Sequence, residues 1–277
     1  MDILSTLFSR FTLSATVFFS GRLCGISSDH ETETAGHLHV LRRGTISIER
    51  GRKRPQVLSE PAVLFSPRPL RHRFKTDENR GAELVCATVE FGAGMLNPLV
   101  RSLPELLIVV LDSMPALAPA VDLLFAEAFS EDPGRQAAVN RLAEYVILLL
   151  LRNAASTNLI QTGTLVGLAD PRIAKVISAI HQGPEQPWTL EALAERAGMS
   201  RARFALHFRN VVGSTPFDYL AEWRIGTAQS LLKKGQPLKT VAPEVGYSST
   251  AALSRAFLHH TGETPTAWLT RTSRSGV

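Results

Sequence analysis

The stretch GMSRARFALHFRNVVGSTP at residues 198–216 recurs in altered form at residues 246–265, which read GYSSTAALSRAFLHHTGETP. From Phe204 onward the two stretches align at a constant offset of 49 residues, so that Phe204 and Phe208 correspond to Leu253 and Phe257. Both pairs have the i, i+4 spacing of neighbours on one helix face. The sequence therefore predicts one structural unit that occurs twice.

Each copy has the residue types of a helix-turn-helix, in which a short capped helix and a glycine turn precede a second capped helix. The predicted caps and turn glycines are Thr189, Gly198 and Ser200 in the first copy and Thr240, Gly246 and Ser249 in the second. The second helices are predicted over residues 201–212 and 250–261. Each ends before a glycine, and a Thr-Pro pair then predicts the start of the next helix.

The segment between the copies, residues 216–234, is predicted to form one long helix. At 1.5 Å per residue it spans about 28 Å. A rigid spacer of this length can place two recognition helices in successive major-groove turns of one duplex, which lie about 34 Å apart.

The charge of the chain is concentrated in the same region. Residues 171–277 hold 13 Lys+Arg against 7 Asp+Glu, net +6, whereas residues 1–170 hold 17 against 18, net −1. This asymmetry favours an anionic partner, with nucleic acid first and an anionic membrane second. Helix-turn-helix pairs also occur in enzymes and in packing domains, but two copies together with this charge favour DNA binding.

The candidate DNA contacts are the outward positions of the two second helices. They are Arg201, Ala202, Ala205, Leu206, Arg209, Ser249, Thr250, Ala251, Ser254 and Arg255. Arginine can bind guanine or a phosphate, hydroxyls can bond to either, and alanine can contact a thymine methyl group or permit close approach. Phosphate contacts are predicted at Arg209, His207, Lys233, Lys234 and Lys239. The alternative for Arg255 is a structural ion pair.

The N-terminal half has a different pattern. Short β-branched and aromatic runs at residues 14–19, 37–41, 45–49 and 84–91 are separated by glycine and proline, which is typical of a β-sandwich or barrel. Residues 98–153 then show helical spacing in three segments, 103–111, 121–128 and 139–150. The helix over 133–152 is so apolar that it must be buried, either within the domain or between two subunits.

These patterns predict an α+β protein. Its parts are a β domain with following helices at residues 1–153, a linker at 154–170 that ends in the cap Asp170 before Pro171, and an all-α domain at 171–277. The longest apolar run is far shorter than the roughly 18 residues of a membrane-spanning helix. Cys24 and Cys86 form no metal-ligand spacing and no disulfide framework, which favours a reducing compartment.

The C-terminal part resembles the DNA-binding domain of the AraC-type transcription factors. The resemblance covers residues 171 to about 270 and depends on WTLEALA at 188–194, AGMS at 197–200, GSTP at 213–216, WRI at 223–225, VGYS at 245–248 and GETP at 262–265. Two departures are Pro243, which we expect in the first turn after Thr240, and Leu253 in place of the usual phenylalanine.

Residues 1–150 resemble, more loosely, the cupin-like sensory domains of such regulators, through HLHVLRRG at 37–44 and PRPLRH at 67–72. The resemblance implies a cytoplasmic homodimer that binds double-stranded DNA, RNA polymerase and a small-molecule effector, with no cofactor and no catalytic residue. A cupin metalloenzyme is the competing interpretation. Against it, Arg42 and Arg43 occupy the place of the carboxylate that follows the paired histidines. His37, His39 and His72 are expected to be solvated, to line a pocket or to bind a metal.

Overall fold

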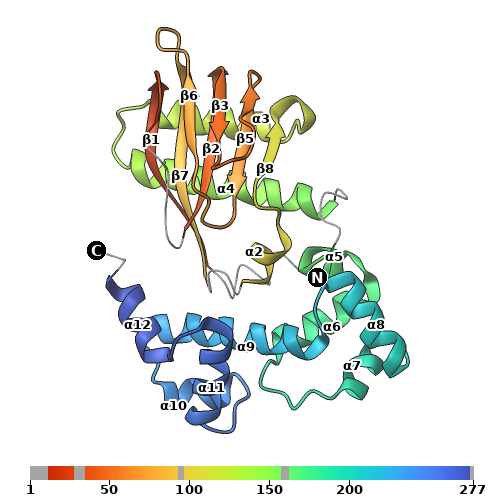
Figure 1. The fold of residues 1–277 in the computed structure, drawn as a ribbon. Helices are drawn as coiled ribbons and strands as arrows, with labels where there is room; N and C mark the ends of the chain where they lie inside the picture. The colour runs from red at the N-terminus through yellow and green to blue at the C-terminus, as the bar shows by residue number, and fades with distance from the viewer. Residues whose placement is uncertain (1–11, 28–34, 93–96, 157–161, 275–277) are drawn as a thin grey trace. The chain divides into compact units, whose positions relative to one another are not determined.

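The chain forms two compact units in the computed structural model, which describes residues 12–27, 35–92, 97–156 and 162–274 (Figure 1). The β unit contains residues 13–91 and 103–156 of the described chain. Of the described chain, the helical unit contains Thr12, Gly92, residues 97–102 and residues 162–274. Within the described residues, no helix is both long enough and apolar enough to cross a membrane.

The β unit is built from two antiparallel sheets. The first has the strand order β1-β7-β2-β5-β8 and the second the order β4-β3-β6. Their bounds are β1 Leu13–Leu23, β2 Gly36–Gly44, β3 Ile46–Glu49, β4 Gln56–Leu58, β5 Ala62–Ser66, β6 Arg73–Thr76, β7 Ala82–Phe91 and β8 Leu107–Val110. Three of the four predicted strand segments lie within strands, and the fourth, 45–49, is strand β3 from Ile46 onward, so the predicted β domain is confirmed.

Two helices accompany the larger sheet, α3 (Leu117–Ala128) and α4 (Arg135–Ser156), which follow the short 3-10 helix η2 (Leu111–Ser113). The edge strand β1 shifts register between Val17 and Phe19. At this bulge the Val17 N–H donates to Asn140 of α4 at 2.9 Å, and Gln136 donates to the Val17 carbonyl at 3.0 Å. Helix α4 thus satisfies backbone groups that an edge strand would leave open.

One helix prediction is wrong. Residues 103–111 do not form a helix, because Leu107–Val110 is strand β8, which pairs antiparallel with residues 62–65 of β5. Two of its four residues are β-branched valines and a third is isoleucine, and such side chains fit a pleated sheet better than a helix. Leu107 and Val109 are buried, which also matches a strand with one inward face.

The two other helix predictions in this region, now α3 and α4, are confirmed. The apolar residues of α4 are covered by other residues of the same chain. Val139, Ala143, Val146, Ile147 and Leu150 are each at most 1% exposed. The apolar face of α4 is therefore part of the core of its own unit.

The helical unit contains both repeat copies. Its elements are α2 Pro98–Ser102, α5 Thr164–Ala169, α6 Pro171–Gln182, α7 Leu190–Arg196, α8 Arg201–Val212, α9 Pro216–Lys233, α10 Leu238–Glu244, α11 Thr250–Thr261 and α12 Pro265–Arg274. Helices α7 and α8 form the first helix-turn-helix, α10 and α11 form the second, and α9 joins them. The predicted tandem arrangement is confirmed.

Each copy has its own aromatic core. Phe204 and Phe208 of α8 and Trp223 of α9 are fully buried in the first, while Leu253 and Phe257 of α11 are fully buried in the second. The first core also contains a polar group that the sequence did not indicate. His181 of α6 is 1% exposed, stacks on Trp223 and lies 2.7 Å from the Tyr219 hydroxyl. Burial raises the pKa of Tyr219.

Most of the predicted caps are confirmed. The side chains of Thr189, Thr215 and Ser249 each accept a hydrogen bond from the backbone N–H three residues later. Ser200 occupies the N-cap position of α8, but its side chain makes no capping hydrogen bond. Thr240 is not a cap, because α10 begins at Leu238 after Pro237.

The earlier start of α10 changes the place of Pro243. It lies inside the helix near its C-terminal end, and not in the first turn as predicted. Proline has no N–H to donate to the carbonyl four residues earlier, so the position weakens the helix. Helix α10 is only 7 residues long.

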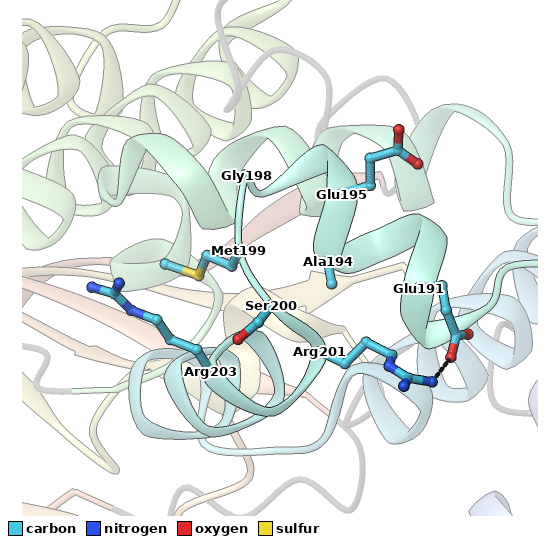
Figure 2. A pocket seen from close by; sticks show the side chains of 8 residues that line it. All are labelled: Glu191, Ala194, Glu195, Gly198, Met199, Ser200, Arg201 and Arg203. Carbon is cyan, nitrogen blue, oxygen red and sulfur yellow. Dashed lines mark hydrogen bonds and ion pairs between the residues drawn. The ribbon is translucent and has the colours of Figure 1, made fainter.

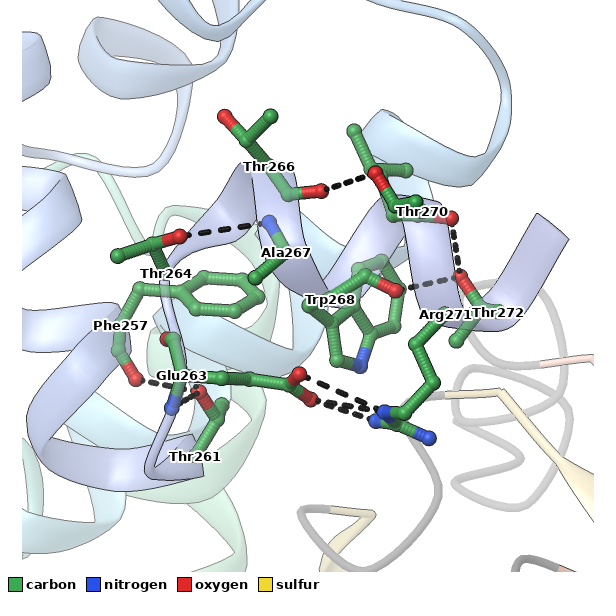
Figure 3. Close-up of polar contacts among 11 residues, drawn as sticks. Phe257, Thr261, Glu263, Thr264, Thr266, Ala267, Trp268, Thr270, Arg271 and Thr272 are labelled. Carbon is green, nitrogen blue, oxygen red and sulfur yellow. Dashed lines mark hydrogen bonds and ion pairs between the residues drawn. The ribbon is translucent and has the colours of Figure 1, made fainter. Parts of the chain in front are cut away.

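The second copy ends in a compact polar turn (Figure 3). Gly262 has φ +78°, a left-handed conformation that ends α11. The Thr261 hydroxyl lies 2.8 Å from the Phe257 carbonyl and 3.0 Å from that of Glu263. The Glu263 carboxylate in turn binds Arg271 of α12 at 2.6 Å. These bonds fix the start of α12, which supplies Trp268 to the core of the second copy.

The helical unit also includes the short helix α2, which comes from the middle of the cupin-like sequence. The Ser102 hydroxyl accepts a hydrogen bond from the Thr164 N–H at 2.8 Å, and Arg101 forms an ion pair with Glu222 of α9. Helix α5 lies in the stretch that we predicted as linker. The predicted domain boundaries remain a prediction, but the contacts join both helices to the C-terminal part.

The cap of α6 gives a first testable prediction. Asp170 accepts hydrogen bonds from the N–H groups of Arg172 (2.9 Å) and Ile173 (3.0 Å), and its second oxygen lies 2.7 Å from His207 Nε2. Burial raises the pKa of Asp170, but these bonds outweigh burial and lower the pKa below its ordinary value of 3.8. We expect Asp170→Ala to lower the free energy of unfolding by about 1 kcal/mol at pH 7.

The sign of the pH dependence follows from the lowered pKa. The folded state favours the charged carboxylate, so the stabilisation is complete above the ordinary pKa and is lost as the pH falls through the lower folded pKa. All three tryptophans lie between residues 188 and 268, so the change in tryptophan fluorescence during urea unfolding reports on the helical unit. Asp170→Asn is the control, since asparagine also caps helices. A constant difference between wild type and Asp170→Ala down to pH 3 would contradict this account.

Candidate nucleic-acid interface

The recognition surface of the first copy is fixed by the turn before α8 and by its two buried phenylalanines. Gly198 has φ +63°, which lets the chain reverse between α7 and α8. Because Phe204 and Phe208 point into the core, the opposite face of α8 is solvent-exposed. Arg201, Ala202, Leu206 and Arg209 are exposed and Ala205 is half-buried. The predicted contact residues of this copy thus lie on the outer side of the helix.

Arg201 differs from the others because it already has a partner. Its guanidinium binds the Glu191 carboxylate of α7 at 2.6 Å (Figure 2). This hydrogen bond lowers the pKa of Glu191. Both side chains are more than half exposed, so the pair contributes little to stability. Contact between Arg201 and a phosphate requires exchange of this partner, and its DNA contact remains a prediction.

Figure 2 also shows a residue that the sequence analysis missed. Arg203 is exposed on α8 and points away from the Arg201–Glu191 pair, beside the open surface hollow at the turn. The signal was present in the sequence, since position 203 lies about 100° from Phe204 around the helix. Arg203 therefore extends the exposed basic surface of α8.

The second copy presents an equivalent surface on α11. Thr250, Ala251 and Arg255 are exposed and Ser254 is half-buried, opposite Leu253 and Phe257. Ser249 uses its hydroxyl oxygen to accept from the Ala252 N–H at 3.1 Å, so its first role is to cap the helix. Within the described parts of the chain, the Arg255 side chain makes no ion pair or hydrogen bond. The alternative of a structural ion pair therefore finds no support there.

The predicted phosphate contacts divide into two groups. Lys233, Lys234 and Lys239 are exposed near the junction of α9 and α10, although Lys233 also lies over the Trp268 ring at 5.7 Å from its centroid. His207 is different, because its Nε2 bonds to Asp170. This bond joins the cap of α6 to the recognition helix α8.

One arginine of α9 contacts both repeat copies. Arg224 donates from Nε to the Pro184 carbonyl at 2.6 Å and from Nη2 to that of Gln186 at 2.9 Å, in the loop before α7. The same guanidinium lies over the ring of Tyr247, in the turn of the second copy, at 5.7 Å. Burial lowers the pKa of Arg224. These contacts hold α9 in a defined position between the two helix-turn-helix motifs.

The histidines singled out in the sequence meet in the β unit. His37, His39 and His72 are at most 4% exposed, and the ring centroids of His39 and His72 are 4.7 Å apart. Their Nε2 atoms are 2.7 Å apart, and His72 Nδ1 lies 2.7 Å from the Leu70 carbonyl. That carbonyl can only accept, so His72 donates to it and neutral His72 accepts from His39 through Nε2.

At this separation the Nε2 atoms of His39 and His72 are hydrogen-bonded to each other. Among the described residues, no group of three or more His, Cys, Asp or Glu side chains is placed to hold a metal ion. The pair instead borders a narrow cavity with Ser66 and mostly apolar side chains, namely Ile48, Leu64, Leu70, Phe74 and Leu106. Cys24 and Cys86 are both free thiols.

Comparisons with known proteins agree with these two units. A family model described as a cupin matches residues 2–156, and one described as a helix-turn-helix domain matches residues 193–271. An uncharacterized HTH-type transcriptional regulator of Haemophilus influenzae is 29% identical, with 85% of this chain and 86% of that protein covered. The RCS-specific HTH-type transcriptional activator RclR of Escherichia coli is also 29% identical, with 96% of each chain covered. The crystal structure of ToxT from Vibrio cholerae O395 covers 95% of this chain and 98% of its own, at 13% identity and a TM-score of 0.43.

Proposed function

Because this chain belongs to the AraC-type family of DNA-binding transcriptional regulators with an N-terminal cupin domain, we propose that it reads its operator through α8 and α11. The two recognition helices would enter successive major-groove turns of one duplex. Helix α9 has 18 residues and spans about 27 Å. The helix alone is shorter than the distance of about 34 Å between successive major-groove turns. The width of the helix-turn-helix motifs at its two ends makes up the difference.

The observation that carries this proposal is the outward surface shared by the two copies. Each recognition helix buries a pair of apolar side chains four residues apart and exposes arginine and alanine on the other side. Small side chains let the helix backbone come close to the base edges, while arginines reach guanine or phosphate. The net charge of +6 in residues 171–277 adds a long-range attraction to the duplex.

The test is selection of bound sequences by the full-length protein from a random duplex pool at near-physiological salt. We expect a motif in two parts whose centres are about one helical turn, 10 to 10.5 base pairs, apart. The same selection with Arg209→Ala/Arg255→Ala provides the control, which should enrich sequences much less. Enrichment of a single short motif, or only salt-sensitive binding without sequence preference, would overturn reading by two helices.

We further propose that the β unit binds a small effector in the cavity beside His39 and His72. The cavity has only about 10 Å³ of free space, no more than one water molecule needs, so an effector must displace part of its mostly apolar lining. The two imidazoles and the Ser66 hydroxyl would then offer polar contacts to a small, largely apolar molecule. A library of such molecules can be screened for compounds that raise the thermal midpoint of the full-length protein. The cavity is the site if His72→Leu abolishes the shifts, and another site is indicated if the shifts persist in a folded His72→Leu protein.

The remaining proposals concern assembly and setting. The curated relatives are transcriptional regulators, and we propose a regulatory role without catalysis, in the cytoplasm and together with RNA polymerase.

We also propose that the protein is a homodimer. Leu123 in the middle of α3 and Phe129 just after its end are 55% and 53% exposed and provide apolar surface on the β unit. Light scattering should give twice the chain mass for wild type and less for Leu123→Ser; a wild-type monomer at micromolar concentration would argue against this.

A further inference from the structure

The two recognition helices carry the same two side-chain types in opposite order. At the offset of 49 residues, Leu206 of α8 corresponds to Arg255 of α11, and Arg209 corresponds to Leu258. All four lie on the solvent side of their helices, where Leu206 is 63% and Leu258 46% exposed. Along α8 the order is leucine and then arginine, whereas along α11 it is arginine and then leucine.

A single exposed leucine is ordinary on a protein surface and says little by itself. Here each exposed leucine lies three residues from an exposed arginine, on the outer face of a helix whose inner face is fixed by buried residues. Leu258 was not among the predicted contacts. Its exposure and its repeat position place it in the same surface as Arg255.

The spacing suits neighbouring base pairs. Residues three apart lie on one helix face and are separated by about 4.5 Å along the axis. Base pairs are stacked about 3.4 Å apart. Two such side chains on a helix in the major groove therefore face adjacent base pairs, and each can contact one of them.

The chemistry of the two side chains then determines which bases they favour. Arginine forms two hydrogen bonds to O6 and N7 of guanine, and an apolar side chain contacts the C5 methyl group of thymine. Within the described residues neither Arg209 nor Arg255 forms an ion pair, so both guanidinium groups are free to bind a base. The shared alanines at positions 202 and 251 permit the same close approach in both copies.

We infer that the two halves of the operator present thymine and guanine in opposite order. Along each recognition helix from its N-terminal end, α8 reads thymine and then guanine, and α11 reads guanine and then thymine. The inference rests on the proposed function, because it requires both helices to lie in the major groove. The inference also assigns Leu206 and Leu258 a role in base specificity, because each selects a thymine.

An exchange of side chains tests the order. The double variant Arg255→Leu/Leu258→Arg gives α11 the same order as α8. After selection by the full-length variant, the half-site read by α11 should change from the guanine–thymine order to the thymine–guanine order, while the other half-site stays as in wild type. The matched control is Leu206→Arg/Arg209→Leu, which should change the other half-site alone.

A second test removes only the methyl group. In the duplex selected by wild type, the thymine assigned to Leu258 is replaced by uracil, which pairs identically but lacks the C5 methyl. We expect affinity to fall about fivefold for wild type and to stay unchanged for Leu258→Ala, because alanine no longer reaches that group.

The outcomes separate this inference from the proposed function. A two-part motif with half-sites that do not respond to the exchanges, or equal affinity for uracil and thymine, would overturn the assigned order and leave reading by two helices intact. Selection without any two-part motif would overturn both. Changes in the expected half-site, together with the loss on uracil, establish the four contacts.

Discussion

Arg255→Ala is expected to lower affinity for the selected operator by about tenfold to a hundredfold, the size of one lost arginine–guanine contact. Its guanidinium is exposed at the centre of the outer face of α11 and has no partner among the described residues. Affinity for random DNA should fall much less, because that binding depends on phosphate contacts. The ratio of specific to random binding should therefore decrease.

The measurement is a titration of both duplexes at several salt concentrations. Lys234→Ala is the matched control, since Lys234 is also exposed in the second half of the domain but lies just after α9. It should weaken binding to both duplexes alike and reduce the slope of log affinity against log salt by about 1. If Arg255→Ala behaves in the same way as Lys234→Ala, Arg255 contacts phosphate and not a base.

The second large effect is expected at Gly246, where alanine should lower the free energy of unfolding of the helical unit by about 2 to 4 kcal/mol. Gly246 has φ +84°, which disfavours any L side chain. A Cβ atom there would lie 2.7 Å from Arg224 Nη2 and 2.9 Å from the Glu185 Cα. The second contact is with backbone, so the loop before α7 must move and loosen the hydrogen bonds of Arg224.

Gly198 offers a control at the equivalent turn of the first copy. Its φ is +63°, but a Cβ there meets nothing within 4 Å. Gly198→Ala should therefore cost only the strain of the left-handed conformation, about 1 to 2 kcal/mol. Urea unfolding followed by tryptophan fluorescence compares the two. Equal losses would show that the contacts around Arg224 do not distinguish the two turns.

Much of the helical unit could be predicted from sequence because its signals are local. Thr189, Thr215 and Asp170 cap helices through bonds to residues two or three positions later, and a short window contains both partners. The repeat itself was visible at a constant offset. The outward faces of α8 and α11 followed from the buried pairs, so the predicted contacts lie on exposed or half-buried positions.

The errors arose where the partner is distant in sequence. Leu107–Val110 has an apolar spacing that fits a helix, and only pairing with β5, more than 40 residues away, makes it a strand. The bonds from His207 to Asp170 and from Arg224 to Pro184 are likewise nonlocal, and the sequence alone does not indicate either of them. Thr240 failed as a cap because proline at 237 begins the helix earlier.

The position of helix α2 in the chain limits which sensory and DNA-binding domains can be combined in a chimera. The helical unit is not a contiguous piece of the chain, since Arg101 and Ser102 belong to it and lie before the last strand of the β unit. A chimera joined after residue 157 would combine this DNA-binding domain with a foreign α2. It would keep Glu222 and Thr164 but inherit whatever side chains the donor places opposite them. Recombination of sensory and DNA-binding modules is thereby restricted to donors whose short helix matches this surface.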